Sequence, residues 1–403
     1  MKKQKICSKI PCGFSIENYK IIFIFLFPIF GVVYNRIRDK NANVKNEYFY
    51  IQLYFISYLF SFIPLLIYLI KYRTKKEKNI EPPKEEGEEE NNLEKNAILQ
   101  FISRRNKIKK IKSIVIIICL CSIGIAFRYF DWKGNTDKKT IGLVYKIPIL
   151  FLLSYFILKY RYYRHHYTSL VLIILTLLTK YLLGVIQSNA LEWVKQHIWL
   201  YFLFSLSHSL LLVLGKYFMD EYDKTPYFLM FIIGIINSFI LISTAIIKYL
   251  VTSESDIFLG FTNYIDSYTS LLLFFADIFS QFLYNLGSWI TVYYFTPLHT
   301  IISENAIEIY YNIYDIKSNI AYWEEKGYVW NMWVIPIILV LNLIFSLIFN
   351  EIIILKCCKF DYNTRIKIEE RERRESNKLF NVIDKSFDTD LSNTTSLTDE
   401  IDE

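Results

Sequence analysis

The sequence has little charge and little glycine for its length. Only 21% of its 403 residues are Asp, Glu, Lys or Arg, and only 12 are glycine. A soluble protein of this length carries more charge and does not gather it between apolar blocks. The shortage of charge therefore argues against a soluble globular fold.

The sequence also lacks the short motifs of common catalytic and channel proteins. It contains no HExxH zinc motif, no GxSxG nucleophile elbow, no phosphate-binding P-loop and no TVGYG filter. The longest segments outside the apolar runs are charged and lack the pattern of a folded domain. We therefore expect neither an enzyme nor a selective channel, and no cofactor.

Cysteine and basic residues exclude two further classes of site. Cys7 and Cys12 have no second pair of Cys or His at ligand spacing, so the sequence predicts no metal site. The net charge is +7, but basic clusters at 71–78, 104–112 and 159–164 flank apolar runs. This is the pattern of the positive-inside rule. We expect contact with membrane lipids and no nucleic-acid partner.

Long apolar runs take the place of these missing features. Ser113–Phe130, Tyr227–Ile247 and Val334–Leu355 are each mostly apolar, and about 20 such residues form a helix that crosses a bilayer. The fold prediction is an all-α polytopic membrane protein with about ten transmembrane helices. The expected spans are 20–35, 48–70, 113–130, 141–158, 168–187, 197–215, 227–249, 268–293, 297–314 and 331–355. The ninth of these is half polar and is the weakest.

The charge pattern also predicts an orientation. With both termini in the cytoplasm, most basic clusters lie on the cytoplasmic side, although the loop at 36–47 violates the rule. The loop at 72–110 contains the charged segment 78–96, which has two prolines and lacks an apolar face, and the tail at 361–403 is rich in charged, Ser and Thr residues. We expect both to be disordered cytoplasmic segments.

Several expected spans carry polar side chains at helical spacing. Asp277, Gln281 and Tyr284 lie on one face of their span. Ionisable groups within a bilayer are costly and usually face a cavity or each other. We predict a cavity that binds a polar solute, in which the carboxylates pair with the cations when the site is empty. Its predicted lining residues are Lys146, Lys180, His208, Asn237, Asp277, Gln281, Tyr284 and Glu304. The alternative is that these groups hydrogen-bond between helices or extend to the interface.

One stretch in the second half has a distinctive arrangement at the ends of its spans. Lys216 follows one expected span, Thr225-Pro226 precedes the next, and Gly234 lies within that next span. The sequence FTPLHTIISENAIE at 295–308 adds a short polar span after a Thr-Pro pair. These stretches resemble the drug/metabolite transporter superfamily, in particular its nucleotide-sugar and triose-phosphate branch.

A third stretch extends this resemblance to the end of the last span. FNEIIILKCCKFDYNTR at 349–365 is similar to the last span's exit in divergent protist members of the family. The likeness covers roughly 195–365, while the first half matches in the number of spans only.

The resemblance implies a fold, a mechanism and a location. It implies two inverted repeats of five spans, here 1–187 and 188–360, with a solute bound between them and alternating access. Family members often exchange phosphorylated solutes, and they reside in Golgi or endoplasmic-reticulum membranes. Whether the protein is a monomer or a homodimer stays open.

Two functional hypotheses follow from the sequence. The first is a transporter of a small organic solute, such as a nucleotide sugar or another phosphorylated metabolite. The second is a membrane anchor that transports nothing and recruits partners through its cytoplasmic loop and tail.

Overall fold

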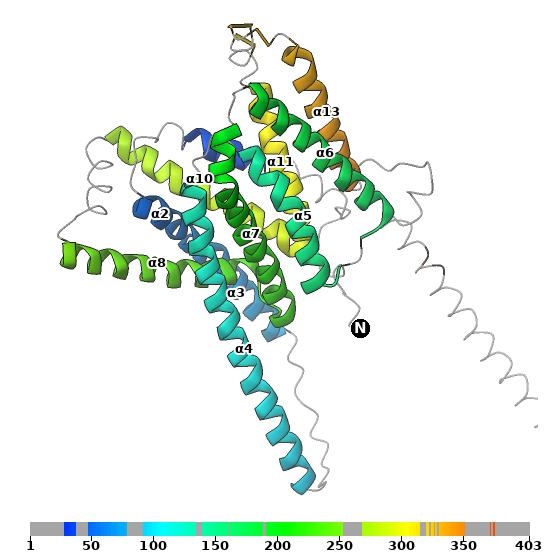
Figure 1. The fold of residues 1–403 in the computed structure, drawn as a ribbon. Helices are drawn as coiled ribbons and strands as arrows, with labels where there is room; N and C mark the ends of the chain where they lie inside the picture. Colours follow the sequence, from blue (N-terminus) through cyan, green and yellow to red (C-terminus); the bar gives the residue numbers. More distant parts are fainter. Residues whose placement is uncertain are drawn as a thin grey trace, which may run out of the picture. The chain divides into compact units, whose positions relative to one another are not determined.

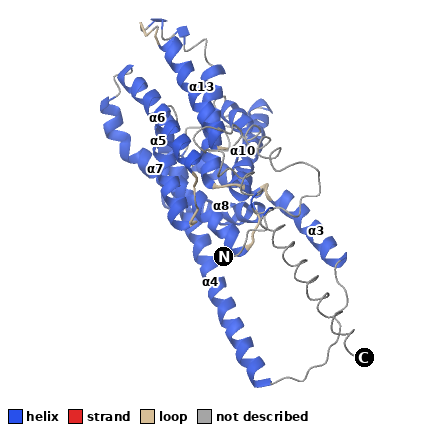
Figure 2. Ribbon diagram, turned by 90° about the vertical axis from the view of Figure 1, so that its right-hand side faces the viewer, coloured by secondary structure: helices blue, strands red, loops and turns tan. Residues whose placement is uncertain are grey.

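The structure is a computed structural model in which every regular element is a helix among the described residues (Figure 2). It describes residues 28–37, 47–78, 92–133, 139–160, 162–187, 191–252, 268–314, 320–321, 324–325, 327–328, 330–350, 371 and 374. Residues 28–37 are helical. The other main helices (Figure 1) are α2 (Glu47–Leu59), α3 (Phe62–Lys78), α4 (Asn92–Lys133), α5 (Lys139–Ile157), α6 (Arg164–Gln187), α7 (Leu191–Tyr222), α8 (Pro226–Thr252), α10 (Tyr268–Tyr294), α11 (Pro297–Tyr314) and α13 (Asn331–Phe349).

The lengths and compositions of these helices confirm the prediction of an all-α membrane protein. In the described part of the chain, 7 segments are long and apolar enough to cross a membrane. They are Ile51–Tyr72, Ile108–Asp131, Arg164–Ile186, His197–Tyr222, Pro226–Val251, Tyr268–Tyr294 and Asn331–Phe349. The apolar part of α5, Val144–Ile157, is shorter, and α11 and the helix at 28–37 are not in this set. The figure of about ten spans therefore stays a prediction.

Large apolar side chains on the outside of these helices support the same conclusion. Phe239 of α8 is 71% exposed, and Trp199 of α7 is 72% exposed. Similarly exposed side chains occur on α4, α6 and α13. A soluble monomer rarely exposes such extended apolar surface, whereas a bilayer covers it.

The second expected span is interrupted. Residues 60–61 form a turn between α2 and α3. Pro64 lies in the first turn of α3, and proline has no N–H to donate and clashes with the carbonyl four residues earlier, that of Phe60. The hydroxyls of Ser57 and Ser61 each donate to a backbone carbonyl three residues earlier, at 2.6 Å. These bonds satisfy carbonyls at the interruption.

Helix α4 differs from the expectation for the loop before the third span. Figures 1 and 2 show it as one uninterrupted helix, 42 residues long. Disorder was expected over 72–110, but α3 continues to Lys78 and α4 begins at Asn92. Residues 79–91 lie outside the described part of the chain, as does most of the tail expected to be disordered.

Glycines allow close helix crossings. Helix α2 packs on α8, and α4 and α5 both pack on α7. At Gly234 of α8, an added Cβ would lie 2.8 Å from Cβ of Tyr58 and 3.2 Å from the carbonyl oxygen of Phe55. At Gly215 of α7, an added Cβ would collide with the ring of Trp289. Small residues at crossings let membrane helices approach closely, so these glycines bring polar groups on neighbouring helices into contact.

The chain divides into two compact units. One comprises Met1–Tyr160 with Ile174–Leu343, and the other comprises Arg161–Ile173 with Ile344–Glu403. In the second unit, the ring of His166 lies edge-on to Phe349, with centroids 4.9 Å apart. All the residues of the candidate site belong to the first unit. The predicted inverted repeats, 1–187 and 188–360, stay a prediction.

Candidate functional site

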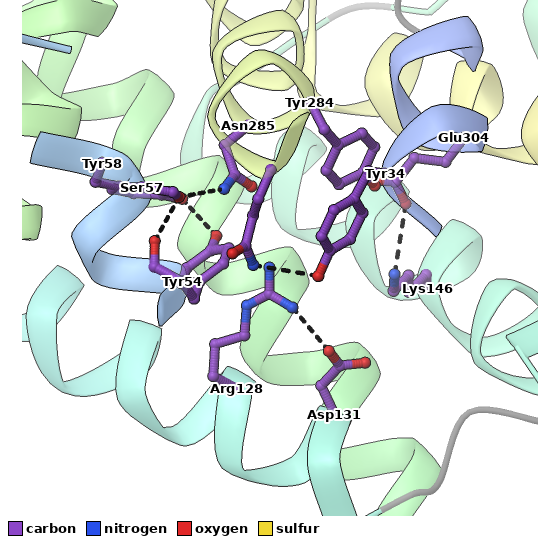
Figure 3. Close-up of polar contacts among 11 residues, drawn as sticks. Tyr34, Tyr54, Ser57, Tyr58, Arg128, Asp131, Lys146, Tyr284, Asn285 and Glu304 are labelled. Atoms are coloured by element: carbon purple, nitrogen blue, oxygen red, sulfur yellow. Dashed lines mark hydrogen bonds and ion pairs between the residues drawn. The ribbon is translucent and has the colours of Figure 1, made fainter. Parts of the chain in front are cut away.

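A buried carboxylate on α11 lies at one side of the site. Oε2 of Glu304 is 3.5 Å from Nζ of Lys146 on α5, and Oε1 accepts a hydrogen bond from the Tyr284 hydroxyl at 3.1 Å. The lysine and glutamate side chains are only 8% and 9% exposed. Three of the predicted site residues therefore meet in one buried group (Figure 3).

Helix 28–37 contributes an aromatic ring to this group. The ring of Tyr34 stacks on that of Tyr284, with centroids 5.7 Å apart and planes 10° apart. The amide nitrogen of Gln281 donates to the Tyr34 hydroxyl at 3.2 Å. Gln281 and Tyr284 come from the stripe that the sequence predicted on one face of α10, and this part of the stripe faces other helices rather than lipid.

Arg128 of α4 is a charged member of the site that the sequence analysis did not select. It is 4% exposed, and its guanidinium carbon lies 3.3 Å from the centroid of the Tyr54 ring on α2. Nη1 lies 2.8 Å from Oδ2 of Asp131, one turn further along α4. Figure 3 shows the guanidinium group directed toward the same centre as the Tyr34 hydroxyl. A planar cation between a ring and a carboxylate is a geometry that arginine favours.

Three stacked rings connect the two cations. Nζ of Lys146 lies 4.6 Å from the centroid of the Phe204 ring on α7. The ring of Phe127, which precedes Arg128, stacks on Phe204 at 5.4 Å and on His208 at 4.3 Å. The predicted residue His208 is thus buried beside both cations. Its Nδ1 has no hydrogen-bond partner in the described part of the chain.

A set of side-chain hydrogen bonds joins α2 to α10 beside Arg128. The hydroxyls of Tyr54 and Tyr58 are hydrogen-bonded, and Nε1 of Trp289 donates to the Tyr58 hydroxyl at 3.0 Å. The amide of Asn285 donates to the Ser57 hydroxyl at 3.3 Å. These contacts hold the ring of Tyr54 in place beneath the guanidinium group.

The remaining predicted residues have other positions. The amide of Asn237 on α8 donates to the backbone carbonyl of Cys121 on α4 at 3.2 Å, which joins two helices as the alternative reading expected. Asp277 is buried on α10, one turn before Gln281. Lys180 is half-buried on α6, and the contacts described above do not include it.

The position of Arg128 along α4 places the site within the apolar layer. Arg128 lies 16 residues after Lys112, which corresponds to about 24 Å at the rise of an α-helix. The residues between them, 113–127, carry no charge. Because the hydrocarbon core of a bilayer is about 30 Å thick, a helix that places Lys112 at one interface places Arg128 inside the core, about 6 Å before the opposite interface.

The described ion pairs of the site balance in charge. Arg128 pairs with Asp131, whose side chain is 17% exposed, and Lys146 pairs with Glu304. The distance from Nζ of Lys146 to Oε2 of Glu304 is 3.5 Å. A short charged hydrogen bond measures about 2.7–2.9 Å, so this contact is longer.

Of the site residues that the sequence analysis did not select, only some carry a signal in the sequence. Arg128 is a charged residue within an apolar run, and the cost of burying charge in a bilayer is itself a signal. Tyr34 and Tyr54 carried no such signal, because the chain has 32 tyrosines and nothing in their spacing separates these two.

Comparisons with known proteins leave the family open. No family model matches this chain, and no curated protein matches it. Among the described residues no group of three or more His, Cys, Asp or Glu is placed to hold a metal ion. We therefore infer the function from the geometry of the buried cluster around Arg128, Lys146 and Glu304.

Proposed function

We propose that this protein is a multi-pass membrane transporter of a small organic anion, and that the buried cluster around Arg128, Lys146 and Glu304 binds the solute. A nucleotide sugar or another phosphorylated metabolite is the expected solute class. The observation that carries the proposal is the presence of two buried cations, Arg128 and Lys146, within the apolar segments Ile108–Asp131 and Val144–Ile157. Such groups are costly in a bilayer and mark solute pathways and relays.

The proposal gives each charged residue a role. In the empty protein, Glu304 neutralises Lys146 across 3.5 Å. An incoming phosphate or carboxylate takes the place of Glu304 beside the lysine, and Arg128 offers a second, planar cation on α4, which packs on α7 as α5 does. The stacked rings of Tyr34 and Tyr284 supply an apolar wall with hydroxyls for the rest of the solute.

The origin of the cluster supports alternating access. Arg128 and Lys146 belong to the predicted first half, 1–187, whereas His208, Tyr284 and Glu304 belong to the second, 188–360. In transporters built from inverted repeats, the solute lies between the halves, and movement of one half against the other opens it to each side in turn. A site shared between both halves is what this mechanism requires. An endomembrane location belongs to the same proposal.

The experiment is solute uptake by proteoliposomes containing the purified full-length protein. Vesicles are loaded with nucleoside monophosphates and offered a panel of labelled nucleotide sugars and sugar phosphates. We expect uptake of at least one solute, stimulated by the internal monophosphate. In Lys146→Gln the uptake falls at least about tenfold, because loss of a buried charged contact costs more than about 1.4 kcal/mol.

Lys133→Gln is the matched control, because Lys133 is an exposed lysine that ends α4. It should leave uptake within about twofold of the unchanged protein. No uptake across the panel by folded protein would contradict the proposed solute class and favour the anchor hypothesis. Equal losses in both variants would contradict the role of Lys146.

A further inference from the structure

The first turns of the membrane-spanning part of α4 carry an unusual density of basic residues. From residue 104 to residue 112 the sequence reads RRNKIKKIK, with no acidic residue. We call its basic residues the α4 collar: Arg104, Arg105, Lys107, Lys109, Lys110 and Lys112. The helix is continuous through the collar into the span Ile108–Asp131.

The collar positions surround the helix. At about 100° per residue, no sector of the circumference wider than about 100° lacks a collar position. A protein partner, or a helix lying flat on a surface, contacts one side of a helix and favours charges in a stripe. Charges on all sides suit an environment that itself surrounds the helix.

The part of the collar whose side chains are described is exposed. Lys109, Lys110 and Lys112 are all exposed, and no described residue forms an ion pair with them. Ile108 and Ile111, which alternate with these lysines, are 50% and 62% exposed. Alternating cations and apolar side chains fit the boundary between lipid headgroups and acyl chains, where lysine stems follow apolar surface and their ammonium groups remain in the polar layer.

The length of the span places the collar at that boundary. Ile108–Asp131 has 24 residues, which extend about 36 Å and exceed the hydrocarbon thickness by about 6 Å. The excess lies at a charged end of the span, and three collar lysines are within its first five residues.

We propose that the α4 collar binds the headgroups of anionic phospholipids in the leaflet that it crosses. The charge complementarity carries the choice of occupant, because basic clusters beside a membrane span are attracted to anionic lipid. The acidic tract at 85–90, EEGEEE, precedes α4 in the sequence. It is the alternative occupant of the collar. This inference is independent of the proposed transport function.

The test measures lipid selectivity of the full-length protein in phosphatidylcholine vesicles. Spin-labelled phosphatidylserine and spin-labelled phosphatidylcholine are compared for the fraction immobilised at the protein surface. At low ionic strength we expect phosphatidylserine to be preferred several-fold, and we expect about 1 M salt to remove most of the preference.

The variant Lys109→Gln/Lys110→Gln/Lys112→Gln should reduce the preference for phosphatidylserine over phosphatidylcholine at least about fivefold, or abolish it. The reason is that each lysine near the membrane surface is expected to contribute about fivefold. Lys133→Gln is the control and should leave the preference unchanged, since it removes an exposed lysine of the same helix outside the collar. Equal immobilisation of the two lipids by the unchanged protein would overturn the proposal. So would an undiminished preference in the collar variant, and the salt dependence keeps the test decisive if that variant does not fold.

Discussion

At the scale of single residues, the burial of Arg128 is compensated by two neighbours. Asp131 supplies the opposite charge at 2.8 Å, and the Tyr54 ring lies 3.3 Å from the guanidinium carbon. Removal of one partner from a buried pair leaves an uncompensated charge, which costs more than the pair itself contributes. The same side chain therefore contributes to stability and, in the proposed function, to solute recognition.

Arg128→Met should lower the free energy of unfolding by about 2–4 kcal/mol, because it removes the buried ion pair with Asp131 and the contact with the Tyr54 ring. Arg128→Lys should have a smaller effect, since lysine keeps the charge but not the planar contact with Tyr54. Thermal unfolding of the purified protein in detergent measures both. Lys133→Met, at the exposed end of the same helix, should stay within about 0.5 kcal/mol. Indistinguishable unfolding temperatures for Arg128→Met and Lys133→Met would contradict the assigned contacts.

At the scale of helices, two glycines make opposite predictions. Gly234 lies against the backbone of α2, whereas an added Cβ at Gly184 of α6 meets nothing within 4 Å. Alanine favours a helix over glycine by about 0.5–1 kcal/mol where there is room. Where the added methyl group must displace its neighbours, overpacking costs about 1–3 kcal/mol.

Gly184→Ala should therefore raise the unfolding temperature slightly, and Gly234→Ala should lower it. The two substitutions have the same chemistry, so each is the control for the other in one thermal unfolding series. If both changes shift the unfolding temperature in the same direction, the close crossing of α2 and α8 at Gly234 is wrong.

The helices show which parts of the fold were predictable from sequence. Apolar runs reveal spans because a bilayer requires their length, and each expected span coincides at least in part with a described helix. The extension of α4 before the expected span at 113–130 was missed because residues 103–112 are mostly basic or polar and interrupt the apolar pattern. The break before α3 was missed because Phe62 and the residues after Pro64 continue the apolar run, so that hydropathy alone does not register it.

The site was predictable only in part, for a similar reason. Helical spacing placed Gln281 and Tyr284 on one face of α10. Lys146 and Glu304 were selected because they are charged residues within expected spans. Spacing within one helix carries no information on which neighbouring helix lies opposite, so the pairing of Lys146 with Glu304, 158 positions apart, required the three-dimensional structure.

At the scale of the whole molecule, apolar helices from both predicted halves converge on one charged cluster. Arg128 and Lys146 come from one half, and Glu304 comes from the other. We propose that Glu304 holds the position beside Lys146 that the anionic solute occupies during transport. Substitutions of the two members of this ion pair should then have different consequences.

The most direct test compares the half-saturating solute concentration for proteoliposome uptake in Glu304→Gln and Lys146→Gln. The account predicts that Glu304→Gln lowers this concentration, because the solute no longer competes with an internal carboxylate for the lysine. Lys146→Gln should raise it at least about tenfold. If both folded variants lose solute affinity to the same extent, the pair has only a structural role, and the proposed binding site is contradicted.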